Sequence, residues 1–367
     1  MRKLDKINEK IKDEKMNIKF KKFKIILLIA IIFIGIILIL ISFINKEPGR
    51  DIKKFADIAN VGKSNITVYF CPEDLCPLKL DGYIDKAENS VYCTFLYLKL
   101  NSTASSLINK YKQGIDVKII TDLEGAQLED SISYQTAEYI PLKLSDNKSM
   151  MHNNFCIFDN KSIWISSGSP TYGNLYWNDD AAILIEVGED ASKLVENYNK
   201  EFDEMWTERR FGKDKTRNTE IYVNEFIENR FCPEDDCQNA MMDYIKSTKS
   251  SLDCVFFSFT LENIRDEVIK KHFEGVNVRI ILEQKLLRKS SAIGGFYDAG
   301  VPVIVDKNPH ILHAKWCVSD GKTVYFGSVN PSVTGTESSS ENLLFIKSSE
   351  LAMIFERKFD EYWEEWK

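Results

Sequence analysis

Histidine is scarce in this chain, with 4 residues among 367, and proline (9) and glycine (17) are also few. With 44% hydrophobic and 12% aromatic residues, this composition excludes intrinsic disorder, collagen and low-complexity classes. A net positive charge is found only near the amino terminus. The formal net charge is −7, but residues 1–24 hold ten Lys/Arg and four Asp/Glu, so the rest carries about −7 − 6 = −13. A body this acidic is a poor general binder of nucleic acid, because phosphate contacts supply most non-specific affinity.

One long hydrophobic run stands near the amino terminus. Residues 25–44 are twenty uncharged, almost wholly apolar residues without a polar face. At 1.5 Å per residue they span about 30 Å, the thickness of bilayer hydrocarbon. A cleaved signal peptide would have a shorter apolar core and a small-residue cleavage site, and neither is present. The run therefore predicts a transmembrane helix that binds the chain to a lipid bilayer.

Flanking charge predicts the orientation of this span. Residues 10–24 contain seven basic side chains and residues 45–59 contain four, so the tail is expected in the cytoplasm and the body outside, in a single-pass arrangement. The predicted organisation is a basic tail (1–24), a membrane span (25–44), a linker (45–64), a first half (65–206), a connection (207–230) and a second half (231–367).

The two halves are copies of one unit. Phe-Cys-Pro-Glu-Asp at residues 70–74 recurs at 231–235, and the same shift of 161 positions aligns many other residues without a gap. The unit is too long for a solenoid repeat, so a duplication explains it. In each half, apolar and β-branched runs alternate with helical spacing, and Gly114 and Gly275 are expected at helix ends. This alternation predicts an α/β sandwich in each half.

Polar residues also recur at matched positions. His152 and His313 are followed two positions later by Asn154 and Lys315, and alternate side chains of a strand share one face. Core packing has no need for such a set, so the pattern favours a catalytic site over structural residues. Fifteen, seventeen and twenty-eight positions after the histidines stand three further pairs: Ser167 and Ser328, Ser169 and Asn330, Asp180 and Glu341.

The second copy resembles the phospholipase D superfamily, whose signature is His-x-Lys-x4-Asp followed by Gly-Ser-x-Asn. His313, Lys315 and Asp320 match its first part, and residues 327–330 match its second. Glu341 falls where the family has an acid partner for the histidine. The resemblance covers about residues 65–367 and implies two α/β/α halves with mixed sheets, related by a pseudo-two-fold axis, with one active site at their junction.

The first copy departs from this signature. Asn154 replaces the lysine, Ser166 the glycine, Ser169 the asparagine and Asp180 the glutamate. An asparagine amide can donate to a phosphate oxygen but carries no charge. Losing a charge-assisted contact costs about 1.5–3 kcal/mol, or roughly tenfold to a hundredfold in rate. Weak or specialised activity is therefore expected, and a lysine restored at position 154 should raise turnover.

The resemblance implies phosphodiester hydrolysis without a metal or other cofactor. One neutral histidine attacks phosphorus to form a phosphohistidine, and the other, protonated, donates to the leaving oxygen and then activates water. By family habit His152 is the nucleophile and His313 the acid, although the departures around His152 leave this order open, and Asp180 and Glu341 orient the rings. The implied phosphate-binding residues are Lys315, Asn154, Ser167, Ser328 and Asn330, and the implied structural acids are Asp159 and Asp320.

The eight cysteines also follow the repeat. Cys71/Cys76 and Cys232/Cys237 lie in Pro-containing turns, where a body outside the cell permits one local disulfide in each half. A zinc site built from both pairs is the alternative, although the spacing is not a standard one. The remaining four are expected in strands as unreactive small hydrophobes: Cys93, Cys156, Cys254 and Cys317. The two histidines without a repeat partner, His272 and His310, are predicted surface or loop residues.

Three functions remain open on sequence alone. The first is a membrane-anchored phospholipase of the D type, with the aromatic loop 172–177 at the lipid interface. The second is a nuclease for single-stranded nucleic acid, with the same aromatics stacking on bases. The third is a degenerate protein that binds phosphate without turnover. The sequence does not predict the oligomeric state.

Overall fold

The computed structural model describes residues 57–146, 148–216, 221–289 and 291–367, which lie in one compact unit, Lys53–Lys367. The predicted membrane span and tail are outside the described residues. Within the described ranges, no helix combines the length and apolar character needed to cross a bilayer.

The first half forms one eight-stranded sheet in the order β1-β2-β8-β7-β6-β3-β4-β5. Strands β3, β4 and β5 are parallel, and the other neighbours are antiparallel. Helix α3 ends before Gly114, whose positive φ of 87° suits a residue without a Cβ. The elements are β1 (Asp57–Val61), β2 (Ser64–Cys71), α2 (Cys76–Lys86), β3 (Ser90–Phe95), α3 (Asn101–Lys112), β4 (Asp116–Thr121), α4 (Leu123–Ala126), α5 (Ser133–Ala137), β5 (Leu142–Leu144), β6 (Phe155–Phe158), β7 (Ser162–Ser166), β8 (Asp180–Glu186) and α6 (Ser192–Asp203).

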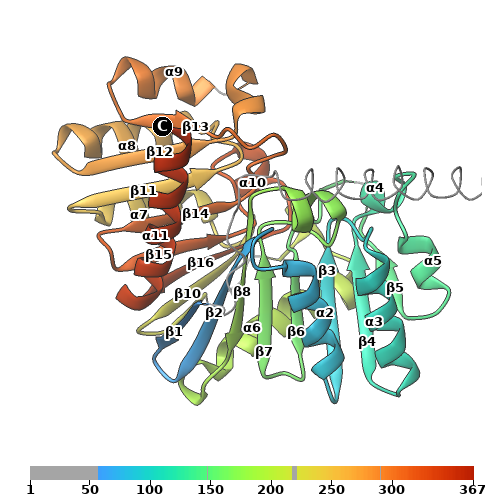
Figure 1. The fold of residues 1–367 in the computed structure, drawn as a ribbon. Helices are drawn as coiled ribbons and strands as arrows, with labels where there is room; N and C mark the ends of the chain where they lie inside the picture. Colours follow the sequence, from blue (N-terminus) through green and yellow to red (C-terminus); the bar gives the residue numbers. More distant parts are fainter. Residues whose placement is uncertain (1–56, 147, 217–220, 290) are drawn as a thin grey trace, which may run out of the picture. The chain divides into compact units, whose positions relative to one another are not determined.

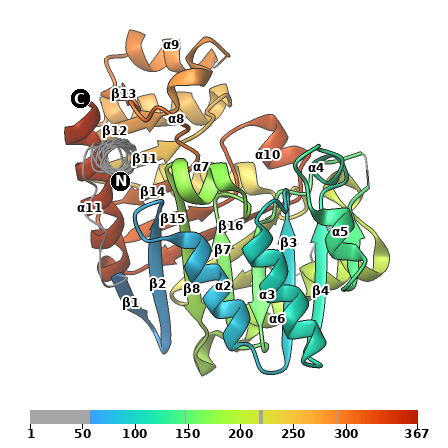
Figure 2. The same cartoon turned by 45° about the vertical axis from the view of Figure 1, so that its right-hand side comes forward.

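The second half repeats this topology in the order β9-β10-β16-β15-β14-β11-β12-β13. Figure 1 shows the first half in blue to green and the second in yellow to red, and in Figure 2 α2 and α3 lie side by side across the first sheet. The prediction of two similar α/β halves with mixed sheets is confirmed. The elements are β9 (Tyr222–Val223), β10 (Ile227–Cys232), α7 (Cys237–Ser247), β11 (Ser251–Phe256), α8 (Glu262–Phe273), β12 (Asn277–Leu282), α9 (Ser291–Asp298), β13 (Val303–Val305), β14 (Lys315–Ser319), β15 (Thr323–Gly327), α10 (Val333–Glu337), β16 (Glu341–Lys347) and α11 (Ser349–Trp366).

A hydrophobic core shared by both halves holds them together. Tyr198 of α6 packs with its ring centroid 5.0 Å from Phe155 of its own half and 5.0 Å from Phe231 of the other half. Trp316 and Phe355 continue this core in the second half. Each half has a further core of its own on the outer face of its sheet. Because this shared core is apolar and buried, it packs the two halves together as one scaffold.

The repeated Phe-Cys-Pro-Glu-Asp segment contributes a buried ion pair at each side of this junction. Glu73 accepts from Lys358 of α11 at 2.8 Å. At the equivalent place in the other half, Glu234 meets Glu201 of α6, and Lys215 of the connection pairs with both carboxylates. Burial raises the pKa of Glu201 and of Glu234, and Lys215 opposes this rise. Each copy of the motif therefore supplies a glutamate that contacts the other half.

All eight cysteines are paired. Cys71–Cys76 and Cys232–Cys237 close the Pro-containing turns. The four strand cysteines, which the sequence suggested were simple hydrophobes, instead form two disulfides: Cys93–Cys156 and Cys254–Cys317. Each joins directly opposed residues of neighbouring antiparallel strands, β3 with β6 and β11 with β14. Sequence spacing alone did not reveal this pairing because the partners lie 63 positions apart.

Candidate active site

The two repeat-related histidines meet at the junction of the halves. His152 lies just before β6 and His313 just before β14, and their ring centroids are 6.0 Å apart with the planes at 87°. Each backbone N–H is held by the other half, His152 by the carbonyl of Ser340 and His313 by that of Asp179, both at 2.8 Å. Side-chain exposures of 7% and 15% leave an edge of each ring open to solvent.

Each histidine is oriented by a carboxylate from the opposite half. His152 Nδ1 lies 2.7 Å from Glu341 Oε2, and His313 Nδ1 lies 3.0 Å from Asp180 Oδ1. Because a carboxylate only accepts, each Nδ1 carries a proton and donates it, which leaves Nε2 unprotonated in the neutral form of each ring. Asp180 and Glu341, each twenty-eight positions after one histidine, thus bind the histidine of the other half. Linear spacing did not reveal this crossed pairing.

Lys315 is the positive charge beside His313. Its Nζ donates to the backbone carbonyls of His313 and of Ser167, the latter at 3.3 Å. Burial lowers the pKa of Lys315 to about 8, against the attraction of Asp180 and Glu341. Burial also lowers the pKa of His313 to about 4, with Lys315 adding to the effect and Asp180 opposing it. His313 is therefore neutral at pH 7.

The equivalent position in the first half has a different geometry. Asn154 adopts a left-handed backbone conformation, with φ at 47°, and β6 begins one residue later. Its Oδ1 accepts from the backbone N–H of Leu96 at 3.1 Å and from Ser169 Oγ at 2.5 Å. Its Nδ2 is buried and, among the described residues, has no hydrogen-bond partner. An orphan donor of this kind is costly unless a ligand satisfies it.

In the second half the asparagine is at position 330, which is the repeat equivalent of Ser169 and not of Asn154. Asn330 Oδ1 accepts from the backbone N–H of Ser258 at 3.0 Å, as Ser169 Oγ accepts from Tyr97 in the first half at 3.1 Å. Ser167 Oγ and Ser328 Oγ each accept from a backbone N–H, that of Ala181 at 2.9 Å and that of Asn342 at 3.1 Å, and Ser167 Oγ also donates to Asp180 at 2.7 Å. Both serines are fully buried, so in this structure they support the acids and strands around the histidines.

Two acids of the motif lie away from the histidines. Asp159 accepts from the backbone N–H groups of residues 88–90, and Asp320 accepts from those of residues 249–251. Burial alone would raise the pKa of these carboxyls, but the N–H donors outweigh it and hold the pKa below its usual value. Both acids therefore fix the turn before a central strand.

Sequence reasoning missed a cluster of buried acids behind His313. Glu283 Oε2 accepts from the backbone N–H of Leu312 at 2.6 Å, and Asp306 Oδ1 accepts from that of Asn308 at 3.1 Å. Burial raises the pKa of Asp306 to about 7, and nearby Glu283 and Asp179 add to the shift. The repeat equivalent of Asp306 in the first half is Ser145, and the repeat equivalent of Asp179 in the second half is Ser340. The one signal in the sequence for this cluster was an acidic residue at the end of a strand in each half.

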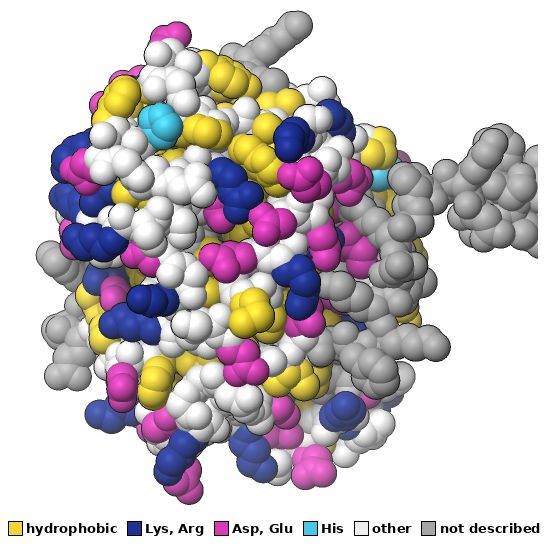
Figure 3. Space-filling view, turned by 60° about the vertical axis from the view of Figure 1, so that its left-hand side comes forward, with side chains coloured by type: hydrophobic (Ala, Val, Ile, Leu, Met, Phe, Trp, Pro, Cys, Tyr) yellow, Lys and Arg dark blue, Asp and Glu magenta, His cyan; other side chains and the backbone are white. Residues whose placement is uncertain are grey.

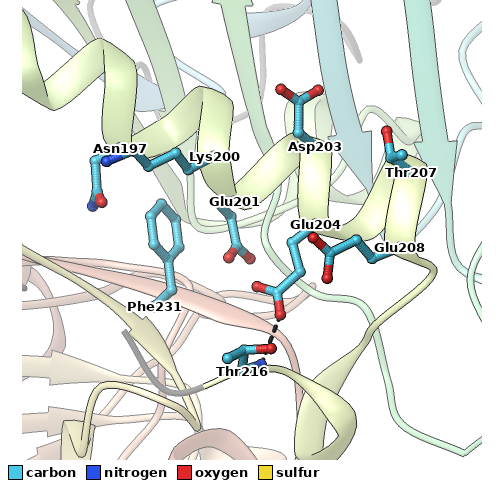
Figure 4. Close-up of a pocket in the computed structure, with 9 residues that line it drawn as sticks. All are labelled: Asn197, Lys200, Glu201, Asp203, Glu204, Thr207, Glu208, Thr216 and Phe231. Atoms are coloured by element: carbon cyan, nitrogen blue, oxygen red, sulfur yellow. Dashed lines mark hydrogen bonds between the residues drawn. The ribbon is translucent and has the colours of Figure 1, made fainter. Parts of the chain in front are cut away.

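The cavity of about 660 Å³ in Figure 4 is separate from the histidines. It lies against α6 and the residues that follow it, where Glu204 accepts from the backbone N–H of Thr216 of the connection at 2.6 Å. Within the described ranges, Glu201, Glu204 and Glu234 are the one group of acids close enough to hold a metal ion. Because Lys215 already pairs with two of these carboxylates, the donor set is that of an ion-pair network.

Two crossed histidine–carboxylate pairs on a duplicated α/β scaffold define a phospholipase D-like protein. The family model "Cardiolipin synthase, PLD-like domain" matches residues 80–206 and again 241–363, and the chain belongs to this family. Each match covers most of one half, in agreement with the duplication.

Individual relatives share parts of the chain. A mitochondrial cardiolipin hydrolase of Chlamydomonas reinhardtii is 32% identical over 127 residues, which are 34% of this chain and 57% of that protein. A phospholipase D of Rickettsia bellii is 28% identical over 137 residues, 37% of this chain and 65% of that protein. The chain thus spans little more than half the length of these relatives. The phosphatidylserine synthase of Haemophilus influenzae has a similar fold, with a TM-score of 0.58 and 13% identity over 80% of this chain and 85% of that one.

Proposed function

We propose that this protein is a phosphodiester hydrolase of the phospholipase D type that acts on phospholipid through a phosphohistidine intermediate. The observation that carries the proposal is the pair of imidazoles 6.0 Å apart, each with Nδ1 bound to a carboxylate and with no hydrogen bond to Nε2 among the described residues. One tetrahedral phosphate can contact both rings, so one can attack while the other protonates the leaving oxygen. Lys315 supplies the positive charge for the phosphate oxygens.

Phospholipid is the favoured substrate class for three reasons. The relatives described above are a cardiolipin hydrolase and a phospholipase D. Exposed aromatic side chains, Tyr172 and Trp177, lie in the segment just before Asp180, and Trp177 stacks on His310 at 5.6 Å. Amphipathic aromatics of this kind suit a membrane interface. On the face in Figure 3, acidic and basic side chains are interspersed without a continuous basic stripe of the kind that tracks a nucleic-acid backbone.

We also propose that residues 25–44 anchor the protein in a bilayer, with the tail in the cytoplasm and the body on the opposite side. The apolar length of the run and the Lys/Arg bias support this arrangement. The four disulfides of the body add to it, because such bonds persist in oxidising compartments. A protease added outside intact cells should degrade the body, and complete protection would contradict the orientation.

A reconstituted assay tests the activity. The full chain in vesicles that contain cardiolipin or phosphatidylglycerol should release phosphatidic acid, and His313→Ala should abolish the release. The same preparation is tested with single-stranded oligonucleotides, because the aromatic side chains could also stack on bases. Cleavage of oligonucleotides with no lipid product would replace the lipid proposal by the nuclease. No turnover of either substrate would favour a phosphate-binding protein.

A further inference from the structure

We propose that the two histidines have fixed and unequal roles: His313 attacks phosphorus, and His152 is the general acid. This inference rests on the proposed function and reverses the order that the sequence resemblance implies. It follows from three differences between the halves, in the neighbouring charge, in the carboxylates and in the surroundings of the rings.

The first difference is the charge next to each ring. Lys315 Nζ donates to the carbonyl of His313 inside the buried site, while the equivalent position two residues after His152 holds the neutral Asn154. An ammonium group disfavours a proton on a nearby imidazole, and this repulsion is strong where water is excluded. The proton that the leaving oxygen needs is therefore disfavoured on His313, and we assign it to the other ring.

The second difference lies in the carboxylates. Asp180 Oδ1 accepts from both His313 Nδ1 and Ser167 Oγ, and Asp180 Oδ2 is buried with no hydrogen-bond partner among the described residues. Among the described residues, His152 is the one hydrogen-bond partner of the Glu341 side chain, and the contact is shorter, at 2.7 Å against 3.0 Å. A carboxylate with one short contact stabilises an imidazolium better than a shared one.

The third difference is the apolar contact at His313. The ring of Phe257 lies 4.9 Å from the ring of His313, and the equivalent residue in the first half is Leu96. Asp180, Lys315 and His152 act on His313, whereas Glu341 and His313 contact His152; Lys315 also interacts with both carboxylates, Asp180 and Glu341. Burial and Lys315 both lower the pKa of His313. A neutral ring with a free Nε2 lone pair is the form a nucleophile needs.

The steps balance as follows. The Nε2 lone pair of His313 forms a bond to phosphorus as the bond from phosphorus to the leaving oxygen breaks. The Nε2 proton of His152 passes to that oxygen, and the alcohol departs. Neutral His152 then takes a proton from water, the resulting hydroxide displaces His313 from phosphorus, and both histidines return to their starting states. Asp180 stabilises the positive charge on the phosphorylated ring.

Rapid quenching of the full-length wild-type protein tests the assignment. The protein is mixed with bis(p-nitrophenyl) phosphate, quenched in alkali during the first turnover and digested, and the phosphorylated peptide is identified by mass spectrometry. The phosphate is expected on the peptide containing His313. Phosphate on the His152 peptide, or turnover without a labelled histidine, would overturn the inference.

Two variants, each tested on substrates with different leaving groups, give a second readout. In the His152→Ala variant, the first-turnover release of p-nitrophenolate, which departs without a proton, should stay within about tenfold of wild type. Hydrolysis of phosphatidylglycerol vesicles by this variant should fall by about 10²–10⁴-fold, because an alkoxide needs the acid. The His313→Ala variant should lose both reactions, by about 10³-fold or more. The reverse pattern would assign the nucleophile to His152.

The failure of this inference differs from failure of the proposed function. If wild-type protein hydrolyses neither the activated diester nor the vesicles, the proposed function itself is wrong. If wild type is active but the two variants exchange their expected patterns, only the assignment is wrong. Circular dichroism and the milder His152→Gln and His313→Gln variants separate loss of chemistry from loss of fold.

Discussion

Lys315 is the phosphate-binding residue whose charge changes with pH in the working range. Burial lowers its pKa to about 8, so it loses its proton at a lower pH than an exposed lysine would. Inhibition by dimethyl phosphate, which stays singly charged, should weaken about tenfold between pH 7 and pH 9. The Lys315→Arg variant should keep its affinity over this range, because a guanidinium does not titrate there. Equal pH dependence in both proteins would show that another group controls anion binding.

Asn154 is the residue at which the structure changes an expectation from the sequence. A lysine at this position would have to adopt the left-handed backbone, at a cost of about 1–2 kcal/mol, and would repel the proton that His152 must hold. Asn154→Lys should therefore lower vesicle hydrolysis by about tenfold and move its alkaline limit to lower pH. Asn154→Gly, which tolerates the backbone and removes the amide, is the matched control. Higher turnover in the lysine variant would restore the original expectation and weaken the assigned roles.

At the scale of elements, the strand disulfides and the turn disulfides should differ in their effect on stability. Cys93 and Cys156 are 63 positions apart and Cys71 and Cys76 are 5 apart, so the first bond constrains a much longer loop of the unfolded chain. Loop-closure entropy predicts losses of about 4 and about 2 kcal/mol when each pair is replaced by alanine. Chemical denaturation of the two double variants measures the difference. Equal losses would show that local packing, rather than loop length, dominates.

The connection between the halves has a close contact with the loops around His152. Gly212 has a φ of 50°, its N–H donates to Ser340 Oγ at 2.7 Å, and an added Cβ would lie 2.2 Å from the carbonyl of Ser338. Since Ser340 also holds the backbone of His152, Gly212→Ala should destabilise the protein by about 1–3 kcal/mol and lower kcat. Gly114→Ala, where an added Cβ meets no atom within 4 Å, is the control for positive φ alone. Identical effects of the two changes would contradict the steric explanation.

Individual helices and strands were predictable because the duplication presents the sequence pattern of each one twice. Gly114 and Gly275 do end helices, and the runs around Cys93 and Cys254 are strands. The pairings across strands and halves were not predictable. Nothing in linear spacing shows that Cys93 faces Cys156, or that Asp180 serves His313 rather than His152. Such contacts depend on register and on the packing of two sheets, which a single sequence leaves open.

For the whole molecule, the crossed contacts predict that neither half works alone. Residues 57–206 contain His152 without Glu341, and residues 231–367 contain His313 without Asp180. Each isolated half would also expose the shared core around Phe155 and Phe231. Separately expressed halves should be inactive and prone to aggregate, while their co-expression should recover activity. This is checked by vesicle hydrolysis and gel filtration, and activity in a single half would contradict the crossed arrangement.

The exchange of carboxylates has a consequence for how such a chain could diversify. In an ancestor with one copy of the unit, the same geometry would have required two identical molecules, each lending its acid to the other. Any substitution there would have appeared on both sides of the phosphate at once. Fusion into one polypeptide removed that constraint, so one imidazole could lose its neighbouring lysine while the other kept it, and a symmetric ancestor could become a directional catalyst.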